Sequence, residues 1–325
     1  MRSSEVESKA RESRLQDSQR DTAGEVAAIV LNFNAYGETK ECIESLVRSG
    51  FSLNAIYLID NCSSDGSGER LHETFSEVRY EQSSHNSGYA GGNNCGLRQA
   101  LVDGFRYLLV INNDVVVQPG FLQPLLETFS LNEDVGAVTG KVLYKDTPDI
   151  INAAGGKLSK LLCTGASRRI GDRNDDQIEK IEIDFIPGML ILLKREVVER
   201  VGFMNESFFL YFEDLEYSLR IHKLFRMMYT SASIVYHKSG GGMKGKAYTD
   251  GYLYYYTRNR LWFFRDARFS YRLYVLLFSL VNCIYKSVIL LSINTFFLQF
   301  ERKKLISLWR GFFAGAFPSM LQRNM

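Results

Sequence analysis

The stretch Ile111-Asn112-Asn113-Asp114-Val115 directly follows the apolar run Tyr107-Leu108-Leu109-Val110. A short, uninterrupted apolar run of this kind predicts a buried strand. Two amides and a carboxylate are poor core material, but they suit the carboxyl edge of an open α/β sheet, where ligands bind. A carboxylate at that edge can hold a divalent cation, which in turn can hold a diphosphate. Asn and Asp also favour plain turns, so the functional interpretation requires other stretches to converge on Asp114.

Strands and helices alternate along the first part of the chain. The predicted strands are Glu25 to Phe33, Ala55 to Ile59, Val78 to Glu81 and the run before Asn112, with segments of helical periodicity between them. This alternation is typical of an α/β fold, here a Rossmann-like, mixed, mostly parallel sheet with right-handed crossovers and flanking helices. Farther along, shorter strands are predicted at Val135 to Val138, Lys141 to Tyr144 and Ile178 to Phe185, with a mobile loop over 155–177.

Composition limits the functional classes. The chain has 325 residues, 46% of them hydrophobic, which suits one large α/β domain with an appendage. A net charge of +2 gives no electrostatic case for a nucleic-acid partner. The five cysteines are scattered and form no CxxC pair, which indicates reduced thiols in a cytoplasmic protein. Residues 1–22 are polar and lack an apolar signal-peptide core, so they are predicted to be a disordered tail.

Two further polar stretches follow predicted strands. Asp60, with Asn61 and Ser63, ends the second strand, where a carboxylate can accept a hydrogen bond from a nucleobase imide. The segment Asn86 to Gly96 holds four glycines and three asparagines, but it lacks the GxGxxG spacing of a dinucleotide site. Glycines there would let the backbone approach a ligand closely. The alternatives are a turn with a helix cap for the first stretch and an irregular loop for the second.

Acidic and basic candidates appear later in the chain. Glu213-Asp214 lies among aromatic residues, whose desolvation raises a carboxyl pKa toward the range of a general base. The alternative is the polar first turn of an amphipathic helix. His237 ends an apolar strand and becomes a metal or phosphate ligand only if that strand end faces Asp114.

In this order the stretches resemble the family 2 glycosyltransferases of GT-A fold, and most closely their rhamnosyltransferase-like branch. The resemblance covers residues 25 to about 240. The matching pieces are Val30 to Asn34, Ile59 to Gly66, Asn86 to Gly96, Asn112 to Asp114, Pro187 to Met189, Val201 to Phe209, Glu213 to Glu216 and His237.

The resemblance implies a role for each matching residue. It implies that Phe33 stacks on the nucleotide base, that Asp60 bonds the pyrimidine, and that Asp214 is the catalytic base. Asp114 matches the last residue of the metal-binding D-x-D motif, whose first position is Asn112 here, and His237 matches a further ligand of Mg²⁺ or Mn²⁺. The implied donor-binding residues are Asn32, Phe33, Asn34, Asp60, Asn61, Ser63, Gly88, Asn93 and Asn113.

The function implied by the resemblance is an inverting transfer of a sugar from a nucleotide diphosphate donor to a hydroxyl group. The favoured donor is dTDP-L-rhamnose, and the favoured acceptor is a glycan or a polyprenyl-diphosphate-linked glycan. A UDP-hexose or UDP-N-acetylhexosamine donor is the first alternative. A nucleotidyltransferase would want a basic, glycine-rich loop after the first strand, which Asn34 to Gly37 is not. A non-catalytic membrane scaffold is the third alternative, and the intact Asp60, Asp114 and Asp214 argue against it.

The carboxyl-terminal part differs in composition. Residues 252–265 are aromatic and basic, and Tyr271 to Phe300 is almost continuously apolar. Ser279, Asn282 and Lys286 would share one face of a helix, which favours a helix lying in the membrane interface over a spanning one. Basic flanks on both sides predict that both ends stay cytoplasmic. We therefore expect a tail (1–22), a GT-A domain (23–245) and a helical region (246–325) attached peripherally to the cytoplasmic side of the inner or plasma membrane. A single tilted span, a buried hairpin and a homodimer interface are the alternatives.

Overall fold

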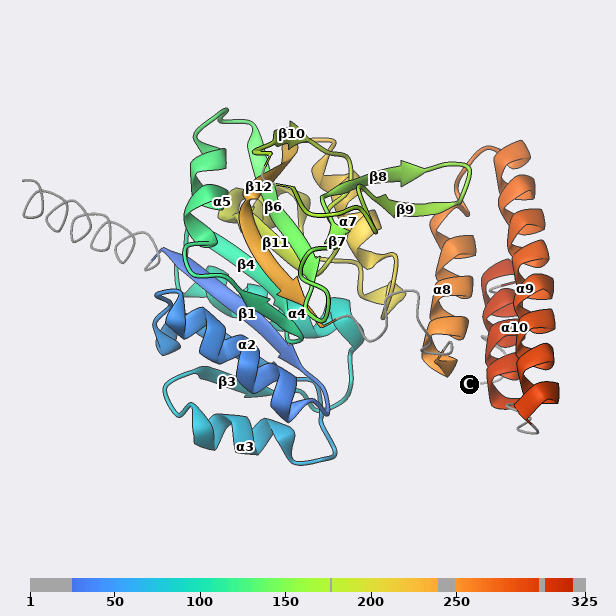
Figure 1. Ribbon diagram of the computed structural model, residues 1–325, viewed down its shortest axis with the longest axis horizontal. Coiled ribbons are helices and arrows are strands. Elements are labelled where there is room, and N and C mark those ends of the chain that lie inside the picture. The colour runs from blue at the N-terminus through green and yellow to red at the C-terminus, as the bar shows by residue number, and fades with distance from the viewer. Residues whose placement is uncertain (1–24, 176, 239–248, 298–301, 318–325) are drawn as a thin grey trace, which may run out of the picture.

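The computed structural model of the chain describes residues 25–175, 177–238, 249–297 and 302–317. The predicted disordered tail, residues 1–22, lies outside these residues. Among the described residues, ten strands form one sheet in the order β10-β12-β6-β11-β4-β1-β2-β3, with β5 paired to β12 and β7 to β6. The sheet forms the centre of the larger part of the molecule, and the last three helices stand beside that part (Figure 1).

The first half of the sheet is parallel, as the sequence predicts. Its strands are β1 (Val26–Asn32), β2 (Ile56–Asp60), β3 (Arg79–Gln82) and β4 (Tyr107–Asn112), linked by α2 (Tyr36–Arg48), η1 (Leu53–Ala55), α3 (Ser67–Thr74) and α4 (Gly88–Val102). Asn32 pairs in register with Asp60, and its neighbour Leu31 pairs with Asn112. The polar ends of three strands therefore meet at one edge of the sheet.

The second half of the sheet is mixed. Antiparallel β11 (Leu190–Lys194) lies between β4 and β6 (Val135–Tyr144), and β12 (Arg226–His237) runs parallel to β6. Strands β5 (Val115–Val117) and β10 (Lys180–Glu182) pair with β12, and β7 (Ile151–Ala153) pairs with β6. The helical elements of this half are α5 (Leu122–Phe129), α6 (Arg195–Val201), η2 (Glu206–Phe208) and α7 (Glu213–Ile221). The two strands predicted at 135–138 and 141–144 are thus one strand.

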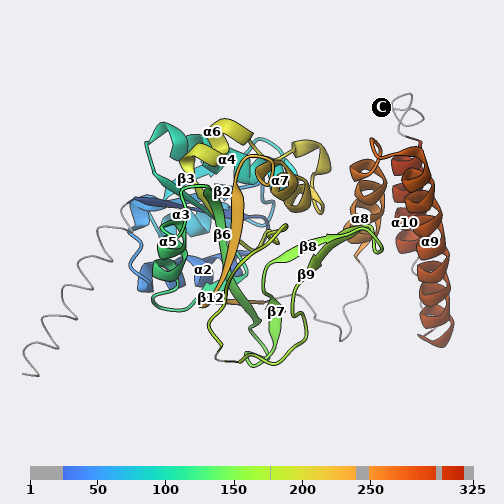
Figure 2. The ribbon, with the colours of Figure 1, turned by 90° about the horizontal axis from the view of Figure 1, so that it is seen from above.

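Both faces of the sheet are buried, which explains the uninterrupted apolar composition of β1. Ala28 and Val30 belong to the core cluster on one face, and the alternate residues Ala27 and Ile29 belong to the cluster on the other. Helices α2 and α5 cover the first face, and α4, α6 and α7 cover the second (Figure 2).

The glycines of the segment 86–96 pack a helix against the sheet. Helix α4 begins at Gly88, so the irregular loop is limited to Asn86 and Ser87. A Cβ atom on Gly92 would lie 2.2 Å from Leu31, and one on Gly96 would lie 2.6 Å from Ile29. These glycines therefore let α4 approach β1 closely, a role that does not need GxGxxG spacing.

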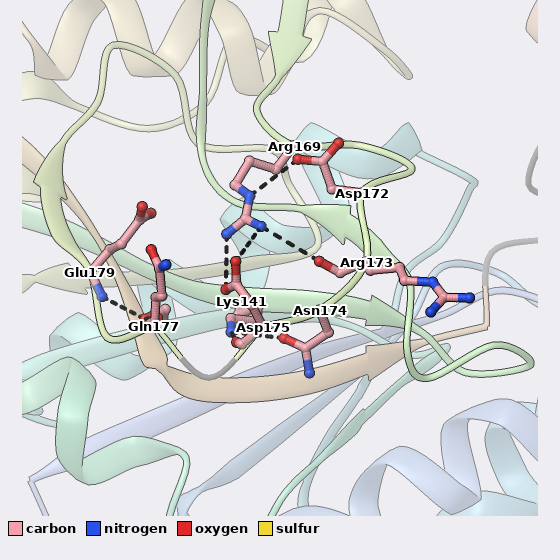
Figure 3. A network of polar contacts seen from close by, with 9 residues as sticks. Lys141, Arg169, Asp172, Arg173, Asn174, Asp175, Gln177 and Glu179 are labelled. Carbon is pink, nitrogen blue, oxygen red and sulfur yellow. Dashed lines mark hydrogen bonds and ion pairs between the residues drawn. The ribbon is translucent and has the colours of Figure 1, made fainter.

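The segment 155–177 contains ordered structure in place of the predicted mobile loop. Residues Gly156–Ser159 (β8) and Thr164–Ser167 (β9) form a hairpin that reaches toward the last helices (Figure 1). The rest of the segment is tied to β6, because the Lys141 amine donates to Asn174 and to the carbonyl of Asp175 (Figure 3). Arg169 pairs with Asp175 and contacts Asp172. Polar residues of this segment therefore form hydrogen bonds and ion pairs within the protein.

The last three helices are α8 (Asp250–Phe263), α9 (Phe269–Phe297) and α10 (Arg302–Ala316). Ser279 and Lys286 of α9 are buried, and Asn282 is half-buried. The Lys286 amine lies over the ring of Tyr252 on α8. The polar stripe of α9 therefore faces the neighbouring helices. The interpretation of this stripe as the polar face of a helix in the membrane interface is wrong. The exposed face of α9 is apolar and includes Leu273, Leu277, Val281, Ile284 and Val288.

Candidate active site

Two cavities hold the predicted acidic residues, and the first lies where the polar strand ends meet. The first, which we call the Asp114 cavity, has a volume of about 400 Å³. The second, the Asp214 cavity, has a volume of about 210 Å³. Chain neighbours line the two cavities, since Leu210 and Tyr255 face the first while Tyr211 and Tyr256 face the second. The Asp114 cavity is lined by Leu31, Phe33, Ala35, Asn61, Asn86, Gly88, Tyr89, Asn112, Asn113, Asp114, Phe209, Leu210, Gly251 and Tyr255.

Asp114 and His237 form an acid–imidazole pair at this cavity. The Nε2 atom of His237 lies 3.2 Å from Oδ1 of Asp114, because β12 pairs with β5 and sets His237 opposite Val115. Among the described residues, Oδ1 of Asn112 is buried without a hydrogen-bond partner, and the buried Oδ1 of Asp114 is the atom that His237 contacts. Buried polar atoms normally have partners, so this grouping fits a cation ligand set. The condition on His237 is met, since its strand end does face Asp114.

The donor set suits a divalent cation only in part. Among the described residues, no group of three or more His, Cys, Asp and Glu side chains is placed to hold a metal ion. Asp114 offers a carboxylate and His237 an imidazole nitrogen, while Asn112 offers a neutral amide oxygen. Hard cations such as Mg²⁺ accept several oxygen ligands, including those of substrate phosphates. The protein groups therefore fit a cation that shares its coordination with a bound diphosphate.

Asn32 organises the ends of β1 and β2. Its side-chain amide donates to Oδ1 of Asp60 at 2.8 Å, to Ser63 at 3.1 Å and to Ser67 at 2.9 Å. The Asp60 carboxylate also accepts from the backbone and hydroxyl groups of Ser63, and Asp60 and Asn32 have no exposed surface. Asp60 thus lies behind the Asp114 cavity, with its carboxylate turned to protein donors.

A hydrogen-bonded chain links this network to the end of β4. The hydroxyl of Thr39 donates to Oδ1 of Asn32 at 2.7 Å and accepts from Nδ2 of Asn113 at 2.8 Å. Asn113 is the neighbour of Asp114, so the Asp60 and Asp114 ends of the sheet share one fixed framework. Thr39 lies on α2 and is buried; nothing in its local sequence distinguishes it from an ordinary core threonine.

Among the remaining predicted donor-binding residues, Phe33 has an exposed ring, whereas the asparagines bond other protein groups. Phe33 is 45% exposed and lines the Asp114 cavity, so its ring is available to a ligand. Asn61 is buried, although it lines the cavity; its side chain bonds Asn86, Ser87 and the carbonyl of Gly88. The side chain of Asn34 accepts from the backbone of Ser64, and that of Asn93 donates to the carbonyl of Tyr89. Asn61 therefore shapes the cavity wall, while Asn34 and Asn93 bond backbone groups and do not line the cavity.

The Asp214 cavity holds a buried acidic pair. Glu213 and Asp214 begin helix α7, and Asp214 accepts hydrogen bonds from the backbone of Gly188 at 3.0 Å and of Leu215 at 2.8 Å. The cavity is lined by Thr164, Gly165, Ser167, Phe185, Pro187, Tyr211, Phe212, Glu213, Asp214, Leu215 and Tyr256. Its walls come from the β8–β9 hairpin, the segment before β11, α7 and α8.

Burial shifts the titration of both acids. Burial, and then the charge of Asp214, raises the pKa of Glu213 well above its ordinary value. Burial also raises the pKa of Asp214, while the N–H groups of Gly188 and Leu215 work in the opposite direction. The two environments differ, since three backbone N–H groups favour the carboxylate of Asp214 and only its own N–H favours that of Glu213. Asp214 is therefore the better candidate for a base, because more donors favour its charged form.

Tyr89 forms the wall between the two cavities. Its hydroxyl donates to the carbonyl of Gly188, whose own N–H donates to Asp214. Burial, followed by the negative charges of Glu213, Asp214 and Asp114, raises the pKa of Tyr89 well above its usual range. Asp114 and Asp214 thus act on the same phenol from adjoining cavities. The three acids do not surround a single pocket: two line adjoining cavities, and Asp60 supports the first from behind.

The α8 residues were not among the predicted site residues. Gly251 and Tyr255 line the Asp114 cavity, and Tyr256 lines the Asp214 cavity, where its hydroxyl lies 2.8 Å from that of Thr164. The aromatic and basic composition of 252–265 was visible in the sequence, but it was assigned to a membrane interface. An aromatic composition alone does not show whether the rings face lipid or a cavity.

These features define the class of protein: a GT-A fold with an acidic residue at the carboxyl edge of a mostly parallel sheet. The sequence profile of glycosyl transferase family 2 matches residues 27–202. The chain belongs to that family. The predicted GT-A fold is confirmed by GalNAc-T7 with UDP, GalNAc and Mn²⁺ (TM-score 0.56, 17% identity, 72% of this chain and 47% of that one). It is confirmed also by the Pyrobaculum calidifontis mannosyltransferase PcManGT with GDP-Man and Mn²⁺ (TM-score 0.53, 13% identity, 90% and 87%).

Two curated relatives are similar over part of their length. The low-salt glycan biosynthesis hexosyltransferase Agl10 of Haloferax volcanii is 23% identical over 200 residues, which cover 61% of this chain and 62% of the relative. The N-acetylglucosaminyl-diphospho-decaprenol L-rhamnosyltransferase of Mycobacterium tuberculosis is 24% identical over 209 residues, which cover 57% and 67%. The match therefore spans less than two thirds of the length of Agl10.

Proposed function

We propose that this chain is an inverting glycosyltransferase that moves a sugar from a nucleotide diphosphate to an acceptor hydroxyl. The observation that carries the proposal is the placement of Asp114 and Asp214 on adjoining cavities with Tyr89 between them. One cavity can hold the leaving group and the other the acceptor. Membership of glycosyl transferase family 2 supports this assignment.

The donor nucleotide belongs in the Asp114 cavity. Phe33 offers an exposed ring for the base, and the framework of Asn32, Asp60 and Thr39 fixes the strand ends around it. Asp114 and His237 would hold Mg²⁺ or Mn²⁺ next to the diphosphate. When bound, the cation neutralises the charge that grows on the leaving group. Asn61 and Gly88 place α4 and the loop before it along the same wall.

Asp214 acts as the general base. Its carboxylate takes the proton from the acceptor hydroxyl while the acceptor oxygen bonds to the anomeric carbon and the bond to the diphosphate breaks. Attack from the side opposite the leaving group inverts the anomeric centre, and no covalent enzyme intermediate is needed. The raised pKa of Asp214 strengthens it as a base.

The donor and acceptor follow from the family branch and from two relatives. We infer dTDP-L-rhamnose or another hexosyl nucleotide as the donor, with UDP-hexoses and UDP-N-acetylhexosamines as competing candidates. The M. tuberculosis relative is named for transfer to a diphospho-decaprenol glycan, which supports a polyprenyl-diphosphate-linked acceptor. The β8–β9 hairpin and Tyr256 would contact the acceptor, because they line the Asp214 cavity.

A lipid-linked acceptor suits a membrane-bound enzyme. Within the described residues, one helical stretch, Phe269–Ser292, is long and apolar enough to cross a bilayer, and only 28% of its most apolar window is buried. We propose that residues 246–325 attach the catalytic domain, residues 23–245, to the cytoplasmic face of the inner or plasma membrane. The exposed apolar face of α9 supports this, and a homodimer through the same face is the alternative.

The test is a panel of nucleotide sugars with MnCl₂ and an N-acetylglucosaminyl-diphospho-prenol acceptor. We expect nucleotide diphosphate release with one donor, and a product of inverted anomeric configuration by NMR. Asp114→Asn separates an enzyme from a scaffold, since it abolishes transfer by an enzyme and leaves a scaffold working. Retention of configuration, or equal turnover by Asp114→Asn, would overturn the proposal.

A further inference from the structure

The loop that leads to Asp214 has an unusual backbone. Three of its non-glycine residues lie in the left-handed region: Phe209 has φ 62°, Tyr211 has φ 68° and Phe212 has φ 74°. Bulky aromatic residues rarely adopt this conformation, so contacts from the surrounding structure must hold it. Phe212 immediately precedes α7, whose second residue is Asp214. The path of the 208–212 loop therefore sets where the Asp214 carboxylate lies.

One buried side chain of α8 holds most of this loop. Asn259 has no exposed surface, and its side-chain Nδ2 donates to the carbonyl oxygens of Phe208, Leu210 and Tyr211 at 2.8, 2.9 and 2.7 Å. The one carbonyl that it leaves, that of Phe209, accepts from the backbone of Tyr89 at 2.6 Å. Four consecutive carbonyl oxygens thus accept hydrogen bonds. The side-chain amide of Asn259 donates to three of them, and the backbone N–H of Tyr89 donates to the fourth.

Neighbouring contacts of α8 support the same loop. The guanidinium of Arg258 donates to the carbonyls of Ser207 and Phe208 at 3.0 and 2.9 Å. The ring of Tyr255 stacks on Phe209 at 4.7 Å, with 20° between the planes. The side-chain amide of Asn259 donates only to backbone oxygens, so it selects the path of the loop irrespective of the rings on it, and its Oδ1 accepts from Nε of Arg258 at 2.8 Å.

We propose that Asn259 is a positioning residue that holds the loop before Asp214, so that α8 is part of the catalytic apparatus as well as of the carboxyl-terminal helices. This inference rests on the proposed role of Asp214 as the base. Loss of the three hydrogen bonds lets the left-handed residues relax and displaces the start of α7. A displacement of about 1 Å at a reacting group can lower the rate about 100-fold.

The first test is hydrogen exchange of the full chain, which does not depend on activity. In Asn259→Leu, peptides that cover residues 205–217 should exchange at least tenfold faster, while peptides of β1 and β2 keep their rates. Asn152→Leu is the matched control, because Asn152 is a buried asparagine on β7 that lines neither cavity. Unchanged exchange over 205–217 in Asn259→Leu would overturn the inference.

Should Asn259→Leu loosen the whole chain, the same local comparison in Arg258→Met decides. That variant keeps the apolar stem of Arg258 and removes its two hydrogen bonds to the loop, the bond from its Nε to Oδ1 of Asn259, and the contact of its charge with neighbouring rings. It should raise exchange over 205–217 by a smaller factor, about threefold. Equal exchange in Arg258→Met and the parent protein would then count against the assignment.

The second test is kinetic and uses UDP-N-acetylglucosamine or dTDP-L-rhamnose, whichever the parent protein turns over with MnCl₂. Asn259→Leu should lower kcat about 10- to 100-fold and change the Kd of UDP or dTDP by less than threefold. The double variant Asn259→Leu/Asp214→Asn should be no slower than Asp214→Asn alone, since the asparagine acts through the base. Multiplied effects in the double variant would contradict a positioning role.

The two tests separate the inference from the proposed function. If Asp214→Asn keeps full activity, the proposed function fails, whatever exchange shows. If Asp214→Asn is inactive while Asn259→Leu has the kcat and the 205–217 exchange of the parent, the positioning role fails and the proposed function stands.

Discussion

The Nε2 atom of His237 lies 3.2 Å from Oδ1 of Asp114, at the ends of two paired strands. The pair sets an imidazole beside the carboxylate that lines the Asp114 cavity, so both groups can ligate one cation. His237→Ala should therefore weaken Mn²⁺ affinity about 10- to 100-fold, measured by calorimetry with UDP or dTDP present. Asp134→Asn, an exposed acid before β6 at the opposite edge of the sheet, is the control. Equal Mn²⁺ affinity in His237→Ala and the parent protein would exclude His237 as a ligand.

Asp60 is expected to affect stability as well as binding. Its buried carboxylate accepts from Asn32 and Ser63, so Asp60→Asn sets an amide group against the donors of its neighbours. We expect a loss of about 1–3 kcal/mol in the free energy of unfolding, measured by urea denaturation. The KM for the donor should rise as well, since the same network fixes the cavity wall. A variant of unchanged stability would show that Asp60 is not part of this framework.

Glu213→Gln should change the pH dependence of stability. Burial raises the folded-state pKa of Glu213 above its ordinary value of 4.5, so the carboxyl group stabilises the fold only while it is protonated. That contribution is full below the unfolded pKa and is lost as the pH rises through the folded pKa. Glutamine has no such loss, so the Tm of the variant should exceed that of the parent by a margin that grows as the pH rises above the ordinary pKa of 4.5. Each kcal/mol of difference corresponds to about 2–4 °C.

The control for this prediction is Glu73→Gln, which alters an exposed glutamate of α3 and should follow the parent at every pH. Parallel curves for Glu213→Gln and the parent would mean that Glu213 is already charged in the folded state. The roles of the acidic pair would then have to be reassigned.

The exposed face of α9 is expected to bind membranes. Leu277 and Ile284 are 52% and 50% exposed on that face, and burying such a side chain in lipid is worth about 1.5–3 kcal/mol. Leu277→Asp combined with Ile284→Asp should lower the fraction bound to phosphatidylglycerol vesicles more than tenfold, as measured by co-sedimentation. Leu131→Asp, at a site 55% exposed after α5, is the matched control. Undiminished vesicle binding accompanied by loss of a dimer would assign the face to a homodimer.

The sequence predicts the first half of the sheet well because its strands are short apolar runs separated by segments of helical periodicity. The β1 run is buried on both faces, and its polar end at Asn32 marks the carboxyl edge. The same logic places Asp114 and His237 at that edge, since both follow apolar strands. Whether they touch depends on β12 pairing with β5, which no local pattern specifies.

Other parts could not be predicted because they depend on distant packing. In the sequence the glycines of α4 resemble loop glycines. Only the structure shows that they pack against Leu31 and Ile29 of β1. Asn259 has no local signal, since its partners are backbone carbonyls about 50 positions earlier. The polar stripe of α9 was assigned to water because periodicity shows that residues share a face, not what that face contacts.

We propose that Asp214 removes the acceptor proton, and kcat and donor affinity in Asp214→Asn test that role. Asparagine keeps the shape of the side chain and cannot act as a base, so kcat should fall about 100-fold or more at saturating donor. The Kd of the nucleotide should stay within about threefold, because the donor occupies the other cavity. A variant that retains the kcat of the parent protein would contradict the claim.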